Sequence, residues 1–367
     1  MKSSPIPRMA LQNPVLRIAA QSAGAIACLL LLLVITLVGL RIAPGEGLHQ
    51  LWTGAVGSAE DGRLYPISAT LVETAPLLLA ALSVGIAWRS GMFSIGAQGQ
   101  ILIGGLCATI SAHVLKNLAP QFVCTVMLIS AMGGGSLWSF IAAWLKVKRG
   151  VQEVISTIML NYIAIHVVGW LVLGPLRAQG NYLAESDPLP PGVMFARLIP
   201  AAWSDHIQTT LHTGVLLALL AAPIMWVFQF RTRSGFNLRI LGANPNAARV
   251  AGIHTEYLQL LAMAVSGALA GLAGAIILLG STTGSLPSVS FGGTSGFTAI
   301  PVALLGGLHP IGALLSALFF GGLTQGCRNL EQNTGVSSVV IYVIQAAAVL
   351  AVVGIRAMKE RSEEAGT

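Results

Sequence analysis

A stretch of glycines interleaved with polar side chains is the first place in this sequence where residue types suggest chemistry. Between residues 91 and 105, five glycines alternate with Ser94, Gln98 and Gln100 in an otherwise apolar run. Irregular backbone survives at membrane depth only where protein or a water-filled cavity satisfies its polar groups. The pattern therefore predicts a broken or re-entrant element whose side chains line a path for a polar solute. Hydrogen bonding between helices, without solute contact, explains the pattern equally well.

A second polar pattern directly follows the basic cluster at residues 146–149. Glu153, Thr157 and Asn161 are four residues apart, so on a helix they lie on nearly the same face. A buried polar stripe faces protein or water, which makes these three side chains further candidates to line the path. The alternative is a modest surface ion pair between Glu153 and Arg149, at i and i+4.

The loop at residues 231–257 contains a short helix with its own start and stop signals. Asn244 can cap the free N–H groups, Pro245 suits the first helical position, and Gly252 can take the left-handed conformation that ends a helix. A helix this short is not stable alone in water. We therefore expect it to lie on a surface, either the ends of this protein's own helices or a cytoplasmic partner.

The sequence offers no assembled active site. It has no phosphate loop and no Gly-Lys pair, and it lacks the HExxH and GxSxG motifs. Its four cysteines show no CxxC spacing, so neither a disulfide framework nor a metal site is indicated. We expect no catalytic residue, metal or cofactor, and energy for uphill transport must come from another chain or an ion gradient.

The elements that position these residues are predicted to be membrane-spanning helices. The chain is 54% hydrophobic and only 9% charged, too few charges to cover a water-facing surface. Apolar runs near or above the ~18 residues needed to cross a bilayer recur along it. The expected fold is an all-α, polytopic membrane protein with about ten transmembrane helices. The predicted spans are 22–41, 67–87, 92–114, 121–145, 152–174, 212–230, 258–280, 295–308, 310–327 and 336–355.

Two of these predicted spans have special features. Span 295–308 would rise only ~21 Å as a helix, less than the ~30 Å hydrocarbon core, which predicts a half-spanning or re-entrant element. In span 258–280, Gly267 and Gly271 lie four residues apart. Small residues on one stripe allow two helix backbones to approach closely in lipid. They predict a helix contact, either a fixed one or a moving one that lines the path.

The distribution of charge predicts the orientation in the membrane. If the N-terminus is cytoplasmic, the outside segments hold six basic residues and the inside segments hold 14 of the 20. This bias predicts that both termini lie in the cytoplasm. Residues 1–21 then precede an uncleaved first helix, 22–355 form the transmembrane domain with the cytoplasmic loop 231–257, and 356–367 form a cytoplasmic tail. The net charge of +7 is scattered between apolar runs, which fits a lipid bilayer and not nucleic acid.

Four segments in this order resemble the permease subunits of ATP-binding-cassette (ABC) importers that serve nucleosides and simple sugars, relatives of branched-chain amino-acid permeases. Residues 91–105 resemble that family's G-x-F-N-I-G-x-E-G-Q pattern, and 150–164 its N-E-V-I-S-T-I-M-L-N-Y-I-A segment. Residues 241–253 resemble its N-P-x-A-A-R-x-A-G-I loop, and 296–322 its V-A-L-L-G-x-L-x-P segment. Ser94 and Gln98 depart from the Asn and Glu that the family often has.

The resemblance implies a pair of permease subunits, identical or homologous, in the inner membrane of a bacterial cell. Each subunit would dock on a cytoplasmic ATPase subunit and receive solute from an extracytoplasmic binding protein. Nucleosides are the first expected solute, simple sugars the second and branched-chain amino acids the third. The short helix would then be the coupling helix, with the contact residues Asn244, Pro245, Ala247, Ala248, Arg249 and Gly252.

Two other functions remain open at this stage. An ion-coupled secondary transporter of a small polar solute would use Glu73 or Glu153 as its ion-linked residue, because acids inside a span are functional candidates. A membrane-embedded enzyme would need an acid, base, metal or nucleophile set that the sequence does not offer. Transport without any ATPase would favour the secondary transporter. Turnover of a lipid or peptide by the chain alone would favour the enzyme.

Overall fold

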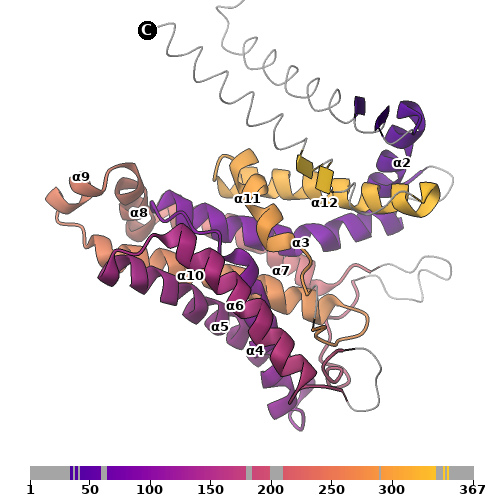
Figure 1. Cartoon of the computed structure of the whole chain (residues 1–367), viewed down its shortest axis with the longest axis horizontal. Helices are drawn as coiled ribbons and strands as arrows, with labels where there is room; N and C mark the ends of the chain where they lie inside the picture. The colour runs from indigo at the N-terminus through magenta and orange to yellow at the C-terminus, as the bar shows by residue number, and fades with distance from the viewer. Residues whose placement is uncertain are drawn as a thin grey trace, which may run out of the picture. The chain divides into compact units, whose positions relative to one another are not determined.

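The computed structural model describes residues 34–35, 38–39, 42–58, 64–178, 184–198, 210–288, 291–335, 342–343 and 345–346. Across these ranges the regular elements are helices, and the β-type pairings are isolated bridges. The all-α prediction is therefore confirmed for the described part of the chain (Figure 1). The helices are α2 (Pro44–Val56), α3 (Leu64–Arg89), α4 (Ala97–Val114), α5 (Pro120–Arg149), α6 (Glu153–Leu173), α7 (Thr213–Arg231), α8 (Arg233–Ala243), α9 (Pro245–Val250), α10 (Thr255–Gly280), α11 (Ser295–Leu305) and α12 (Pro310–Thr334).

Six of the described helices are long and apolar enough to cross a membrane: α3, α5, α6, α7, α10 and α12. The predicted count of about ten spans is not confirmed. The predicted span 22–41 and the predicted span 336–355 lie almost wholly outside the described residues, as do the proposed terminal segments 1–21 and 356–367. α11 has only 11 residues, which agrees with the short element predicted there.

The chain divides into two units, residues 1–54 with 323–367 and residues 55–322. In the first unit, α2 packs against the end of α12. The backbones approach so closely that a Cβ on Gly326 would lie 2.4 Å from the carbonyl oxygen of Leu51. The side-chain amide of Asn329 donates hydrogen bonds to the carbonyl oxygen and the side-chain oxygen of Gln50, at 2.9 and 3.0 Å.

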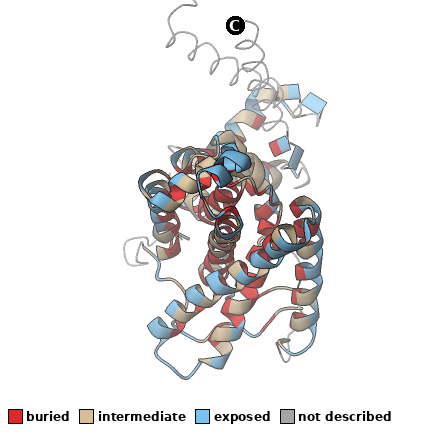
Figure 2. Ribbon diagram, turned by 90° about the vertical axis from the view of Figure 1, so that its left-hand side faces the viewer, coloured by how far each residue is buried: buried red, intermediate tan, exposed pale blue. Residues whose placement is uncertain are grey.

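In the second unit, α10 packs against α3, α4 and α5 through glycine contacts. A Cβ on Gly267 would lie 2.2 Å from the carbonyl oxygen of Gly135, and one on Gly271 would lie 2.1 Å from that of Ala131. The predicted small-residue stripe is therefore a close helix contact. Figure 2 shows buried residues concentrated where the helices face one another. Most residues of α3 and α10 are buried, whereas fewer than half are buried in α5, α6 and α7, so these three helices lie on the outside of this unit.

Candidate functional site

The backbone breaks between α3 and α4, inside the glycine-rich segment. After Arg89, the N–H of Gly91 donates to the carbonyl of Trp88 at 3.1 Å, and the N–H of Met92 donates to that of Ala87 at 3.0 Å. This pair of bonds is the Schellman motif, which needs a left-handed residue, here Gly91 with φ +78°. Residues 92–96 are not helical and α4 begins at Ala97. The predicted span 92–114 is thus a helix preceded by an irregular segment, as the interleaved glycines indicated.

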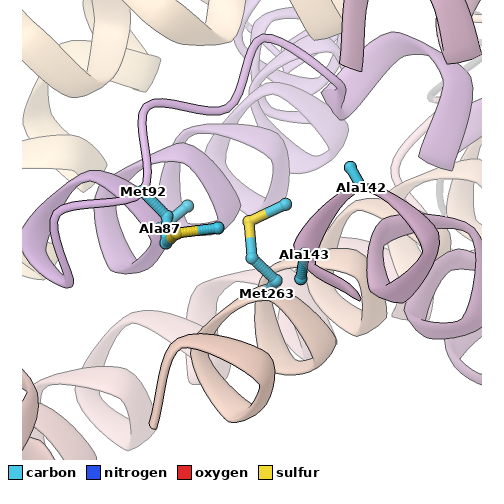
Figure 3. Packing of buried hydrophobic residues seen from close by; sticks show 5 residues of the cluster. All are labelled: Ala87, Met92, Ala142, Ala143 and Met263. Carbon is cyan, nitrogen blue, oxygen red and sulfur yellow. The ribbon is translucent and has the colours of Figure 1, made fainter. Parts of the chain in front are cut away.

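Two contacts anchor the start of this segment. Met92 is fully buried beside Ala87 and against Ala142, Ala143 and Met263, so it ties the break to α5 and α10 (Figure 3). The indole N–H of Trp88 donates to the carbonyl of Ser94 at 2.9 Å. These contacts fix the backbone at Met92 and at Ser94, the first residues of the irregular segment.

The polar stripe of α6 faces the broken backbone. The side chain of Asn161 accepts a hydrogen bond from the N–H of Gly99 and donates one to the carbonyl of Ile95, both at 2.8 Å. Gly99 lies in the first turn of α4, where N–H groups lack helical partners, so Asn161 caps α4 from a neighbouring helix. The hydroxyl of Thr157 accepts from the N–H of Ile95 at 3.2 Å. Two of the predicted stripe residues therefore bind backbone that would otherwise be unsatisfied.

Glu153, the third stripe residue, is buried at the start of α6 and forms an ion pair with Lys146. Its other carboxylate oxygen accepts from the N–H of Phe93 at 3.4 Å. The alternative pairing of Glu153 with Arg149 is wrong. The two residues do not share a helix, because α5 ends at the left-handed Gly150 and a new helix starts at Glu153.

Gln98 connects the start of α4 to the start of α11. Its side-chain nitrogen donates to the carbonyl of Gly293 at 2.9 Å, and its side-chain oxygen accepts from the N–H of Gly296 at 2.9 Å. A Cβ on Gly296 would lie 2.4 Å from the Cα of Gln98, so the two backbones are nearly in contact. The short helix α11 is therefore held directly against the break.

Ser94 and Gln100 complete the set of predicted pathway residues. The hydroxyl of Ser94 accepts from the N–H of Gly96 at 3.1 Å, and Gln100 lies beside the same glycine. The side-chain oxygen of Gln100 is buried without a hydrogen-bond partner among the described residues, as is the indole nitrogen of Trp138. The structure brings all six residues around the break, and none is more than 5% exposed. Contact between any of them and a solute remains a prediction.

The short helix predicted in the loop 231–257 is present as α9. The side chain of Asn244 accepts from the N–H groups of Asn246 and Ala247, at 3.0 and 3.1 Å, and Pro245 is the first helical residue. The helix ends in a second Schellman motif around Gly252, with φ +74°. Every punctuation signal that predicted this helix is confirmed.

The helix α9 lies on the ends of α8 and α10. Ala248 is fully buried against Leu238, Leu241 and Leu258, while Ala247 is exposed and Val250 is 91% exposed. Figure 1 shows α8 and α9 together at one end of their unit. Of the residues expected to contact a partner, Ala248 packs inward and holds α9 in place. The other five are exposed: Asn244, Pro245, Ala247, Arg249 and Gly252. Ala247 and Arg249, together with Val250, which the sequence did not single out, form the outward surface of α9.

Three partners of the site were missed by reasoning from the sequence: Lys146, Gly293 and Gly296. Lys146 pairs across a chain reversal, where no fixed spacing applies. The two glycines act through backbone groups, which carry no side-chain signal. The run of glycines around residue 293 was the one available sign that another backbone comes close there.

Comparison with known proteins identifies the family of the chain. Residues 67–349 match the family described as branched-chain amino acid transport system / permease component. The guanosine ABC transporter permease protein NupP of Bacillus subtilis is 34% identical over 83% of this chain and 84% of its own. The glucose ABC transporter permease protein TsgB13 of Haloferax volcanii is 32% identical over 93% and 87%. The nucleoside ABC transporter permease protein NupB of Lactococcus lactis is 33% identical over 83% and 82%. The chain therefore belongs to this family of membrane permeases.

Proposed function

We propose that the chain is the permease subunit of a binding-protein-dependent ABC importer in the inner membrane, with nucleosides as its first candidate solute and simple sugars as its second. The similarity to nucleoside, guanosine and glucose ABC transporter permeases over most of the chain supports this solute class. In this proposal two permease subunits form the pathway, separate ATPase chains hydrolyse ATP, and an extracytoplasmic protein delivers the solute. The permease itself performs no catalysis.

One observation carries the coupling role of α9: the helix is fixed on one side and open on the other. Ala248 inserts into the apolar cluster formed by α8 and α10, whereas Val250 is 91% exposed. The exposed side of the helix, formed by Ala247, Arg249 and Val250, is therefore available to a separate subunit. We assign this surface to the ATPase subunit, so that movement of the ATPase pushes α9 and α9 pushes α10.

The pathway is proposed to open at the α3–α4 break. A push on α10 reaches α4 and α5 through the glycine contacts, because backbones packed that closely cannot slide independently. The break is held by discrete hydrogen bonds between its backbone and the side chains of Thr157 and Asn161, and by the bond that Gln98 donates to the carbonyl of Gly293. A set of such bonds either forms or does not, which suits switching between two packings. In an open packing, the released side chains would face the solute.

The chemistry at the break suits a neutral, hydroxyl-rich solute. The side chains of Ser94, Gln98 and Gln100 offer hydrogen bonds without fixed charge. The one carboxylate there, that of Glu153, is already paired with Lys146. A nucleoside or a sugar needs such uncharged donors and acceptors.

The coupling role is tested by cross-linking through an introduced cysteine. We expect Val250→Cys to form a cross-link to the ATPase subunit encoded beside this chain, when membranes are treated with a short bifunctional thiol reagent. Leu118→Cys, also exposed but in the turn between α4 and α5, is the control and should give no product. Equal cross-linking at both positions, or none at Val250→Cys, would count against the assignment.

The solute class is tested by competition in membrane vesicles that contain the whole transporter. Uptake of labelled guanosine should be reduced by other nucleosides and less by glucose. If glucose competes better than nucleosides, the ranking is reversed and the carrier is a sugar permease. If leucine is the best competitor, neither proposed class is correct.

A further inference from the structure

Positive charge gathers around one aromatic ring where α3 and α7 end. The guanidinium carbon of Arg89 lies 5.1 Å from the ring centroid of Phe230, and that of Arg239 lies 4.8 Å from the same centroid. The ring of His309 is 5.0 Å away, centroid to centroid. We call Arg89, Phe230, Arg239 and His309 the basic cluster.

The cations of this cluster have no described carboxylate partner. The ion pairs of Lys146 with Glu153 and of Lys148 with Glu256 do not involve the cluster. The Nε atom of Arg239 is buried without a described hydrogen-bond partner. Burial, and then the positive charge of Arg89, lower the pKa of His309.

Such an arrangement is costly for the protein alone. Like charges held together repel, and the ring of Phe230 offsets only about 0.5–2 kcal/mol per cation. Guanidinium groups present several N–H donors in a planar fork that matches the oxygens of a phosphate. An anion with phosphate geometry would relieve the repulsion and use these free donors.

The surface next to the cluster indicates what kind of molecule carries the phosphate group. Along α7, the exposed residues Leu216, Leu220, Ile224 and Val227 form an apolar stripe that ends one turn before Phe230. At the same end of α7, Arg231 lies 5.5 Å from the ring of Trp226. Tryptophan beside a basic residue at the end of a span is typical of the level of lipid headgroups. The apolar stripe of α7 matches the acyl chains of a phospholipid, and the positive charge at the end of the stripe matches its phosphate group.

We propose that the basic cluster binds the phosphate of an anionic phospholipid whose acyl chains lie along the apolar stripe of α7. The lipid would contact the ends of α3 and α7, the middle of α8 and the connection that carries His309. Basic pockets between membrane helices are the usual sites for anionic headgroups. The proposal does not depend on which solute is transported.

The test measures lipid retention by the purified full-length chain in detergent, using native mass spectrometry. The probes are phosphatidylglycerol, phosphatidylcholine with the same chains, and inorganic phosphate as a competitor. The test variant is Arg89→Gln with Arg239→Gln. The control variant is Lys116→Gln with Arg233→Gln, which removes the same charge from exposed positions that have no described contacts with the cluster.

The wild-type chain and the control should retain phosphatidylglycerol at least about tenfold more strongly than the test variant does, and phosphatidylcholine should bind the wild-type chain weakly. Equal retention by the test variant, equal loss in the control, or displacement by millimolar inorganic phosphate would overturn the proposal. So would loss of ATPase binding in the test variant with retention unchanged, because the cluster would then serve a protein.

A second measurement needs no variant and decides the matter if the test variant does not fold. Adding phosphatidylglycerol should raise the thermal midpoint of the wild-type chain, and phosphatidylcholine should not. Equal shifts with both lipids would show that the phosphate charge is not recognised.

Discussion

Asn161 offers the sharpest test of how the α3–α4 break is built. Its side chain caps α4 through Gly99 and binds the carbonyl of Ile95, both at 2.8 Å and both buried. The substitution Asn161→Leu keeps a similar volume, so it removes these two hydrogen bonds without leaving a large cavity. The N–H of Gly99 and the carbonyl of Ile95 then lose this partner.

The expected cost follows from those two backbone groups. An unsatisfied buried group costs about 1–3 kcal/mol. Hydrogen bonds between side chains of membrane helices average only about 0.6 kcal/mol, because the freed partners find substitutes. Backbone groups at a tight break cannot rotate to a substitute. We therefore expect Asn161→Leu to lower the free energy of unfolding by about 2–4 kcal/mol.

The assay measures the free energy of unfolding in bicelles, where a protein that binds a tag on the chain traps the unfolded state. His166→Leu is the matched control, since it removes a polar side chain from the exposed face of the same helix. The control should change stability by less than about 0.5 kcal/mol. If Asn161→Leu behaves like the control, the stripe on α6 does not hold the break and our interpretation of it is wrong.

Four further substitutions or conditions have definite expected results. Gly271→Ala, whose new Cβ would meet a backbone oxygen at 2.1 Å, should lower the thermal midpoint, whereas Gly133→Ala, with open space around it, should not; equal effects would refute the tight crossing. Gln98→Ala should reduce uptake more than membrane assembly, and equal loss of both would favour a packing role alone. Ala247→Glu should separate ATP hydrolysis from uptake while the chain stays inserted, and unchanged uptake would contradict the coupling surface. Burial lowers the pKa of His212, so folding favours the neutral imidazole. The protein should therefore keep its full stability above about pH 6.5 and lose stability as the pH falls below that value, because the unfolded chain then binds a proton that the folded chain does not. His212→Gln should flatten this pH dependence of the thermal midpoint, and an unchanged slope would show that another group titrates.

The residues that start and end helices could be recognised from the sequence. Asn244, Pro245 and Gly252 predicted the start and end of α9 because caps act within a few residues of the chain. The interleaved glycines around Gly91 predicted the break between α3 and α4 for the same reason. The pair Gly267 and Gly271 predicted a close crossing, although not the helix that it meets.

Contacts between distant segments were not readable in this way. The spacing of Glu153, Thr157 and Asn161 correctly placed them on one face, but the same spacing suits a path for solute and a brace for backbone. Which backbone they bind depends on how α4 and α6 pack, and that is a tertiary property. The pairing of Glu153 with Lys146 was missed because it crosses the reversal at Gly150.

The most direct test of the whole account is the energy source of uptake. Proteoliposomes should contain this chain, the ATPase subunit and any second permease subunit encoded beside it, with the binding protein and labelled guanosine added outside and ATP enclosed. We predict uptake that requires ATP and the ATPase subunit, and that persists when proton and sodium gradients are collapsed. Uptake by this chain without the ATPase, driven by an ion gradient, would contradict the account.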